Sequence, residues 1–401
     1  MERYDLIVIG AGISGLSLAH YCQRAGLKTL VIERSERIGG CFNSHSFSGD
    51  AAGFWLELGA HTCYNSYGNL IGIMEQCALL DRILAREKVS FRMLVDSGIK
   101  SIPSQLSFLE LFASVWHIFT QEKKGASVAS YYATIVGKKN FDRVFAPAFN
   151  AVVSQRANDV PADMLFKKRP RRKDILKSYT LVGGLQTITD TIARNPGITT
   201  MTGTDVTGIT FDGSSYRLTT ADGTTFEATT LALATPPPEA SRLLQGVAPE
   251  LSPFLARIPC ETIETVGVAV QKDALRIAPL AGIIAVNDIF YSAVSRDTVP
   301  HESQRGFSFH FKAGTADQEG KLRRISEVLG VKRETLRHVA TQENRLPSPV
   351  VGHGEITDGI DRLIAGRRLL VTGNYFAGMA IEDCVSRSRS EFERLTAMGY
   401  R

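Results

Sequence analysis

The chain has 401 residues, 44% of them hydrophobic and 22% charged, with a net charge of +5 at pH 7. This composition is ordinary for a globular protein of two domains, and it excludes a disordered, collagen-like or disulfide-stapled chain. The mild positive charge does not indicate nucleic acid as a partner. It is compatible with an anionic substrate or an anionic membrane surface.

Cysteine spacing and hydrophobic runs indicate a cytoplasmic protein. None of the six cysteines forms a C-x-x-C pair or lies near a histidine cluster, so no metal site is predicted and neutral thiols in a reducing compartment are expected. The first predicted strand begins near Tyr4, which leaves no room for a signal peptide before it. No apolar run is long enough to cross a bilayer, and peripheral contact with the inner face of a membrane stays open.

The first forty residues predict a strand, a glycine-rich turn, a helix and a second strand. Residues 5–9 form a short apolar run typical of a strand buried on both faces. Gly10, Gly12 and Gly15 follow at G-x-G-x-x-G spacing. Gly10 permits the tight turn, Gly12 leaves room for a pyrophosphate, and Gly15 lets the helix pack closely against the strand.

A dinucleotide is the ligand that this order of elements predicts. The helix begins with unpaired N–H groups, those of Ile13 and Ser14 among them, and with the positive end of its dipole, both of which attract phosphate. Glu33 closes the second strand, 29–32, about 20 residues further on. Its carboxylate can accept hydrogen bonds from both ribose hydroxyls of an adenosine.

The residues after Glu33 favour FAD over NAD. The segment 34–40, Arg-Ser-Glu-Arg-Ile-Gly-Gly, resembles the extension found in flavoproteins of the amine oxidase superfamily, which includes protoporphyrinogen oxidases and carotenoid desaturases. The resemblance implies that Arg37, Gly39 and Gly40 approach the FAD diphosphate, and Arg34 beside them is interpreted as a solvated turn residue. No second G-x-G-x-x-G sequence is present, so electrons are expected to leave reduced flavin to oxygen, a quinone or another protein.

The segment 57–61, Glu-Leu-Gly-Ala-His, resembles the acidic-x-Gly segment that lies along the flavin in this superfamily. The resemblance implies backbone contacts from Gly59 and Ala60, where a larger side chain would clash. His61 is either a base that faces the flavin ring or a packed histidine.

Three segments in the middle of the chain are also candidates for the cofactor site, two of them by resemblance. Residues 183–188 resemble the Gly-Gly-Met/Leu-x-x-Leu segment of protoporphyrinogen oxidases. Val206 lies on a predicted edge strand, where its backbone can pair with adenine. Ala234 and Thr235 end a buried strand in a turn similar to the Ala-Thr-Gly/Pro turn close to the cofactor in the superfamily.

The C-terminal part predicts a last strand over 369–374 and a helix that begins near Met379, Ala380 and Ile381. The N-terminal end of this helix is expected at the flavin pyrimidine edge, where it stabilises the negative charge of reduced flavin. By the resemblance, Gly373 and Asn374 approach the ribityl phosphate region. Residues 373–384 resemble the C-terminal signature of protoporphyrinogen oxidases, with Glu382 in place of the usual proline.

Residues 70–176 are predicted to be mainly helical. The apolar run 108–119 is too short to span a bilayer; a core helix is the default interpretation, and an interfacial helix that admits a lipophilic substrate is the alternative. The run 167–173 has six basic residues in seven and is interpreted as a solvated face, with contact to a membrane or a partner as the alternative.

The expected fold is α/β. A Rossmann-like FAD-binding domain of the glutathione-reductase type is formed by residues 1–69, 178–250 and 346–401. An α+β substrate domain is formed by the insertions 70–177 and 251–345, where alternating stretches such as 265–270 predict half-buried strands.

The predicted reaction is transfer of hydride from a carbon of a small organic substrate to flavin N5. The resemblance favours a porphyrinogen, protoporphyrinogen or coproporphyrinogen, which needs an apolar slot and cations for its propionates but few acid–base groups. Arg92 is a candidate carboxylate anchor. Amine oxidation is the first rival, with Lys312 as the candidate lysine. A carotenoid or squalene desaturase is the second rival, and a flavin-bound scaffold without turnover is disfavoured. The sequence does not predict the oligomeric state.

Overall fold

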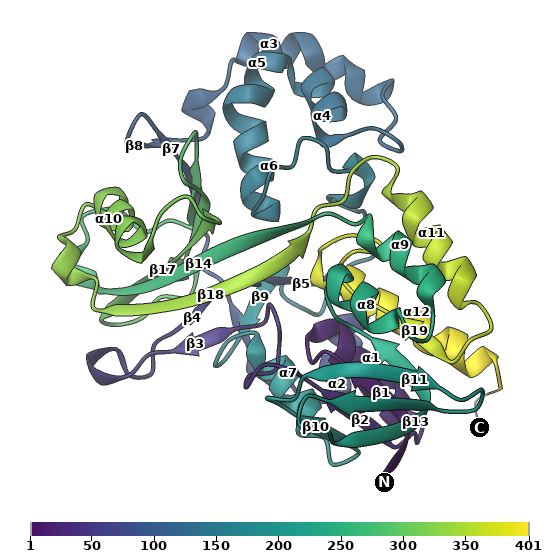
Figure 1. The fold of residues 1–401 in the computed structure, drawn as a ribbon. Helices are drawn as coiled ribbons and strands as arrows, with labels where there is room; N and C mark the ends of the chain where they lie inside the picture. Colours follow the sequence, from purple (N-terminus) through teal and green to yellow (C-terminus); the bar gives the residue numbers. More distant parts are fainter. Residues whose placement is uncertain (1, 400–401) are drawn as a thin grey trace.

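The computed structural model describes residues 2–399 and arranges them around two large sheets (Figure 1). The first sheet has the order β10-β2-β1-β13-β12-β11, with β19 beside β13. Its strands are β1 (Arg3–Ile9), β2 (Thr29–Ile32), β10 (Ile198–Met201), β11 (Val206–Phe211), β12 (Tyr216–Thr220), β13 (Thr225–Leu233) and β19 (Leu369–Val371). Tight turns at residues 212–213 and 222–223 join β11, β12 and β13 as antiparallel neighbours.

The first strand shows why this sheet is buried on both faces. β1 pairs in parallel with β2 and β13, because α1 (Ile13–Arg24) returns the chain to the same end of the sheet. Leu6 and Val8 pack into the core beneath α1, whereas Ile7 and Ile9 pack into the core on the opposite face. The prediction of a strand buried on both faces at residues 5–9 is therefore confirmed.

The second sheet has the order β18-β14-β17-β16-β15-β7-β8. Its strands are β7 (Phe91–Val95), β8 (Gly98–Ser101), β14 (Cys260–Gln271), β15 (Gly282–Ala285), β16 (Phe290–Ser295), β17 (Gln304–Lys312) and β18 (His338–Pro347). Phe307, Phe309 and Phe311 of β17 share one core with α10 (Gln318–Leu329). On the other face, a Cβ at Gly267 would lie 2.5 Å from the Leu58 side chain, so the sheet rests closely on that segment.

The two sheets are formed by different parts of the chain. Every strand of the first sheet lies within 1–69, 178–250 or 346–401, and every strand of the second lies within 70–177 or 251–345, apart from the last two residues of β18. The long strands β14 and β18 run between the two halves (Figure 1). The domain boundaries themselves stay a prediction.

The expectation that 70–176 is mainly helical was wrong for residues 83–101. This stretch forms β6 (Ile83–Ala85), β7 and β8. The chain reverses between β7 and β8 at Asp96 and Ser97, both with positive φ, and β7 then pairs in parallel with β15. Long-range pairing with a strand almost 200 residues away decides the structure here, and a local pattern does not contain it.

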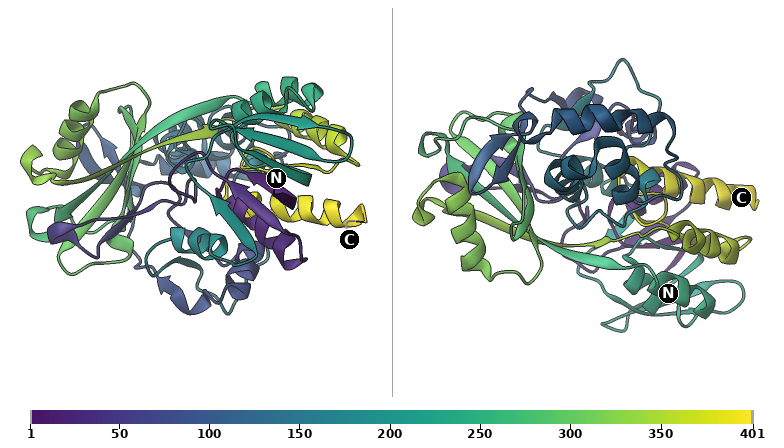
Figure 2. Two further views of the ribbon diagram at one scale, coloured as in Figure 1. Left: turned by 60° about the horizontal axis from the view of Figure 1, so that its bottom comes forward. Right: turned by 90° about the horizontal axis from the view of Figure 1, so that it is seen from above.

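The helical part is shorter and lies over the gap between the two sheets (Figure 2). It consists of α3 (Phe108–Ser114), η4 (Val115–Phe119), α4 (Val128–Val136), α5 (Lys138–Asn140), η5 (Phe141–Phe145) and α6 (Ala146–Val153). In the view from above it faces the reader (Figure 2, right). Within residues 2–399, no helix has both the length and the apolar character needed to cross a bilayer.

The remaining elements connect these parts. Short strands form two small sheets, β3 (Ser44–Ser46) with β4 (Trp55–Glu57), and β5 (Cys63–Tyr64), β9 (Ser178–Leu181) and β6. The other helices are α2 (Gly68–Gln76), α7 (Gln186–Ala193), α8 (Pro237–Leu244), α9 (Ser252–Ala256), α11 (His353–Ile364) and α12 (Ile381–Ala397). Single 3₁₀ turns are η1 (Gly49–Ala51), η2 (Leu80–Arg82), η3 (Pro103–Gln105), η6 (Ala162–Met164), η7 (Pro249–Leu251), η8 (Lys272–Ala274), η9 (Arg296–Thr298) and η10 (Arg333–Thr335).

Candidate functional site

The turn between β1 and α1 has the shape of a phosphate cradle. Gly10 has φ +105°, and a Cβ there would lie 2.6 Å from the Ala234 carbonyl oxygen. A Cβ at Gly15 would lie 1.9 Å from the Gly10 carbonyl oxygen. At Gly12, by contrast, the nearest atom to a built Cβ is Cα of Gly40 at 4.0 Å, so space is open in front of the helix. No side chain of residues 2–399 caps α1, which leaves the first N–H groups, at Ile13 to Gly15, for an anion.

Glu33 lies at the end of β2 with half of its acceptor capacity free. One carboxylate oxygen accepts the N–H of Ala11 at 2.9 Å, and the other accepts the N–H of Ser35 at 3.0 Å. A carboxylate offers about four acceptor positions, so two remain for the hydroxyls of a ribose. Thr204 donates its N–H to the Glu33 carbonyl at 2.9 Å, which places the start of β11 and Val206 close to this carboxylate. β11 is an edge strand, as expected.

Arg37 shapes the loop that follows Glu33. Its guanidinium donates to the carbonyls of Ile38 (2.6 Å), Phe42 (2.8 Å) and Gly40 (2.7 Å). These hydrogen bonds fix the shape of the loop. The loop lies against the glycine-rich turn, since Gly39 pairs with Gly12. Direct contact between Arg37 and a diphosphate stays a prediction. Arg34 is exposed and lies 3.7 Å from Glu239, in keeping with a solvated turn.

The turn after β13 lies against the same cradle. Ala234 donates its N–H to the Ile9 carbonyl at 2.9 Å. The Thr235 hydroxyl is buried and has no hydrogen-bond partner among residues 2–399. A buried hydroxyl without a partner is costly, so this group indicates a ligand or a water molecule beside it.

The N-terminal half of α12 packs against the start of α1. The Ser388 hydroxyl donates to the Ser14 carbonyl at 2.7 Å and lies 2.9 Å from the Thr372 hydroxyl. α12 begins at Ile381, as predicted, and its N-cap residue, Ala380, has no side chain that could occupy the helix end. Among residues 2–399, no side chain caps the N-terminus of either helix, which suits the phosphates and the redox edge of one long cofactor.

The segment before α12 is packed tightly. Gly373 has no room for a side chain, because a Cβ there would lie 2.4 Å from the Tyr375 ring. Asn374 is half-buried, and Met379 lies against the helical part, with its sulfur 3.5 Å from the side-chain nitrogen of Gln155. Met379 thus joins the C-terminal segment to the core of the helical part.

Glu382 and Asp383 carry structural interactions that the sequence analysis missed. The two carboxylate oxygens of Glu382 accept the N–H groups of Asn69 (2.8 Å) and Leu70 (3.1 Å), and so Glu382 caps α2. Asp383, also buried, accepts from Lys167 (3.1 Å) and Arg169 (2.6 Å). No local signal marks these pairs, since their members lie 200 to more than 300 residues apart.

The basic run 167–173 is thus not simply a solvated face. Lys167 and Arg169 point inward to Asp383, and Arg172 pairs with Glu75 at 2.8 Å. Of the six basic residues in this run, Lys168, Arg171 and Lys173 are exposed. Lys167 and Arg169 thereby attach the segment that follows the helical part to the first turn of α12. The number of basic residues in the sequence does not show whether their side chains form ion pairs or face solvent.

His61 belongs to a buried polar chain between the two halves. Its Nε2 lies 2.9 Å from Nε2 of His310 on β17, and Nδ1 of His310 lies 3.0 Å from the Thr265 hydroxyl on β14. Burial lowers the pKa of His310 to about 4 and lowers the pKa of His61 well below its ordinary value. Both imidazoles are therefore neutral at pH 7, and one donates to the other.

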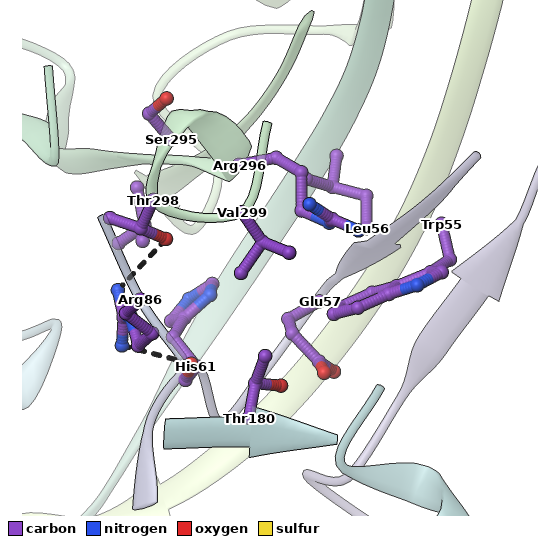
Figure 3. A pocket seen from close by; sticks show the side chains of 11 residues that line it. Trp55, Leu56, Glu57, His61, Arg86, Thr180, Ser295, Arg296, Thr298 and Val299 are labelled. Atoms are coloured by element: carbon purple, nitrogen blue, oxygen red, sulfur yellow. Dashed lines mark hydrogen bonds between the residues drawn. The ribbon is translucent and has the colours of Figure 1, made fainter. Parts of the chain in front are cut away.

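A cavity of about 20 Å³, room for one water molecule, lies next to His61 (Figure 3). Arg86 reaches the His61 carbonyl at 3.4 Å and the Thr298 hydroxyl at 3.2 Å. Arg296 stacks on the Trp55 ring at 3.9 Å, and two of its guanidinium nitrogens are buried without a partner among residues 2–399. Burial lowers the pKa of Arg296 to about 10.

Glu57 also lines this cavity and is almost fully buried. One of its oxygens accepts the N–H of Leu185 at 2.7 Å, and the other accepts the Ser44 hydroxyl at 2.8 Å. Burial raises the pKa of Glu57 to about 7, although these hydrogen bonds favour its charged form. Beyond it, Gly59 has no room for a side chain, since a Cβ there would lie 2.2 Å from the Cys41 carbonyl oxygen, and Ala60 donates its N–H to that oxygen at 2.8 Å.

The other two candidate catalytic residues lie elsewhere on the second sheet. Arg92 is exposed on β7. Lys312, at the end of β17, donates to the Asp288 carbonyl and lies 5.2 Å from the centre of the Tyr291 ring. The roles proposed for Arg92, Lys312 and His61 stay predictions.

Comparison with known proteins identifies the family. The sequence profile described as flavin containing amine oxidoreductase matches residues 13–275, more than half of the chain. The chain belongs to this family. FAD is accordingly its cofactor, and the residues described above fit it: the open space at Gly12, the free acceptors of Glu33, the unpartnered Thr235 hydroxyl and the two uncapped helix ends.

Individual proteins similar to this flavin-containing amine oxidoreductase share only a short sequence match or a low sequence identity with it. The chain is 31% identical over 83 residues to 15-cis-phytoene desaturase of Narcissus pseudonarcissus, a match that covers 21% of this chain and 14% of the desaturase. Its fold is similar to that of a candidate protoporphyrinogen oxidase from Exiguobacterium sp. 255-15, with TM-score 0.78, 17% identity and 99% of both chains covered. It is also similar to putrescine oxidase bound to putrescine, with TM-score 0.70, 14% identity and 99% of both chains covered.

Proposed function

We propose that this flavin-containing amine oxidoreductase dehydrogenates a small, largely apolar organic substrate of the porphyrinogen type, protoporphyrinogen or coproporphyrinogen. The observation that carries the proposal concerns the titratable side chains of β17 on the sheet face above residues 57–61: they are already engaged in hydrogen bonds within the protein. His61 and His310 are neutral and bonded to each other, and Lys312 is bonded to the Asp288 carbonyl. Such a site suits a macrocycle, which tautomerises by itself and needs few acid–base groups.

In this proposal, different residues bind the cofactor and shape the substrate site. Gly10, Gly12, Gly15 and Glu33 would hold the adenosine diphosphate half of FAD, and the N-terminal end of α12 would stabilise the negative charge of the reduced cofactor. Bound FAD would supply the hydride acceptor for the substrate carbon, with oxygen, a quinone or another protein as the final electron acceptor. The His61–His310 pair holds a proton between two neutral rings and keeps charge out of the site.

The similarities to other proteins support two rival substrates. Similarity to putrescine oxidase favours an amine, and the short match to phytoene desaturase favours a polyene. The amine is disfavoured by the position of Lys312, whose ammonium is bonded to a backbone carbonyl. We place the enzyme in the cytoplasm, in peripheral contact with the inner face of a membrane.

An anaerobic reduction assay separates these substrates. The FAD-loaded protein is mixed in turn with protoporphyrinogen, coproporphyrinogen, putrescine and phytoene, and the absorbance of oxidised flavin is followed. We expect a porphyrinogen to bleach the flavin and porphyrin fluorescence to appear. Bleaching by putrescine or phytoene alone would contradict the proposal, and a Lys312→Met variant shows whether any amine turnover depends on that lysine.

A further inference from the structure

The helical part exposes an unusual group of large apolar side chains. Six of them lie in the twelve residues of α3 and η4, and a seventh follows α6; the exposed fractions run from 50% at Ile118 to 88% at Leu109. We name this group the apolar face: Phe108, Leu109, Phe112, Trp116, Ile118, Phe119 and Phe166. Core packing, the default interpretation of this run, was therefore wrong, since no residue of α3 or η4 is buried.

Hydrogen bonds within the helical part bring together the segments that carry these side chains. Lys123, just after η4, donates to the Leu165 carbonyl, which brings the segment of Phe166 next to the end of η4. Glu110, the acidic residue of α3, is turned away from solvent: its two oxygens accept the N–H groups of Lys139 and Asn140, both at 2.9 Å. The same contact places the exposed Lys138 and Lys139 beside α3.

Charge is concentrated in the same part of the chain. Residues 103–177 contain 13 Lys and Arg but six Asp and Glu, whereas the rest of the chain contains 33 Lys and Arg and 35 Asp and Glu. The net positive charge of the protein thus belongs entirely to the segment that carries the apolar face. A protruding aromatic surface bordered by lysines is complementary to an anionic bilayer, where the rings enter the boundary of the acyl chains and the lysines remain at the headgroups.

We propose that the apolar face docks this protein on the surface of an anionic lipid bilayer. This inference deepens the proposed function and rests on it, because docking on a bilayer gives the site access to the lipophilic substrate proposed above. From the docked face the chain runs through Phe166 to Lys167 and Arg169, which bind Asp383 in the first turn of α12. The lipid-facing surface is therefore connected by one short segment to the helix end expected at the flavin.

The fluorescence of Trp116 reports docking directly. The chain has two tryptophans: Trp55 is buried and Trp116 is 66% exposed. We expect the emission of the FAD-loaded protein to shift to the blue with vesicles of phosphatidylcholine containing one part in three of phosphatidylglycerol, and to shift little with phosphatidylcholine alone. Trp116→Phe should abolish the shift. An unchanged emission of the wild-type protein would overturn the proposal.

Vesicle co-sedimentation tests the surface by substitution. The double variant Phe112→Ser/Phe119→Ser should lower binding about tenfold or more, and Lys124→Glu/Lys139→Glu should lower binding to anionic vesicles. The matched controls are Phe211→Ser, an exposed phenylalanine on β11, and Lys332→Glu, an exposed lysine far along the chain; both should bind as the wild type. Equal binding by test and control variants would overturn the proposal.

Two further readouts separate the alternatives. Light scattering without lipid shows whether the protein forms a dimer that Phe112→Ser/Phe119→Ser dissociates; such a dimer would make the face a contact between copies and overturn the proposal. Flavin content and anaerobic bleaching are measured on the same variants. Loss of vesicle binding with normal bleaching shows that docking and the proposed function are distinct, and absence of bleaching with normal vesicle binding overturns the proposed function alone.

Discussion

At the scale of single residues, Glu33 shows how a sequence motif and a structure inform each other. The motif places a carboxylate at the end of β2, and the structure shows that this carboxylate already holds two backbone N–H groups, at Ala11 and Ser35. It therefore fixes the turn between β1 and α1 and keeps free acceptor positions, which we propose bind the ribose of FAD.

Glu33→Ala should consequently weaken FAD binding by about 10- to 100-fold, since charge-assisted hydrogen bonds contribute roughly 1.5–3 kcal/mol. FAD retained after dialysis, measured by its absorbance, checks this. Glu33→Gln keeps an acceptor for one N–H and should lie between the wild type and Glu33→Ala. If the alanine variant retained full FAD content, the ribose role of Glu33 would be wrong.

Glu57 leads to a prediction about pH. Its folded pKa of about 7 is above the value of 4.5 of the free side chain, so the folded state binds the proton more tightly. Stability is then lost as pH rises from 4.5 to 7, by roughly 3 kcal/mol in total for this group. Glu57→Gln can retain the contacts to Leu185 and Ser44 without ionising. We expect the Tm of Glu57→Gln to exceed that of the wild type at pH 8 and to approach it at pH 4.5.

At the scale of helices and strands, the C-terminal helix organises the site through its first turn. Glu382 caps α2 with both oxygens, and Asp383 binds Lys167 and Arg169. One turn of helix thereby fixes α2 and the end of the helical part around the terminus expected at the flavin.

Glu382→Ala should therefore destabilise the protein by about 1–2 kcal/mol, the range for loss of a helix cap and its favourable charge at the helix N-terminus. Urea unfolding of the FAD-loaded protein measures this. Glu382→Gln keeps one acceptor and should lose less. Glu393→Ala, an exposed acidic residue on the same helix, is the matched control and should change the free energy of unfolding little. Equal effects of all three substitutions would contradict the capping role.

Sequence patterns predicted the nucleotide-binding elements well and the inserted part poorly. The glycine spacing, Glu33 and the start of α12 are local features whose geometry follows from a few adjacent residues. The strands at 83–101 and the contacts of Glu382, Asp383 and His310 depend on partners brought close only by the fold. Apolar residues at 108–119 carry no sign in the sequence of whether another element covers them.

At the scale of the whole molecule, the His61–His310 contact joins the two halves across their buried boundary. His61 follows β4, and His310 lies on β17 of the second sheet. A charge on either ring would be buried, and a doubly protonated pair has no acceptor between the two Nε2 atoms.

Acid should therefore weaken this boundary. The folded pKa of both histidines is below 6.5, so their contribution to stability is present above pH 6.5 and is lost as pH falls toward 4. Glu57 acts in the opposite direction over an overlapping range, so the wild-type profile alone does not separate the two effects. We expect His61→Asn/His310→Asn in a Glu57→Gln background to lose less Tm between pH 7 and pH 5 than Glu57→Gln alone. An identical loss in the two proteins would show that acid acts at another place, and that the boundary does not depend on a neutral histidine pair.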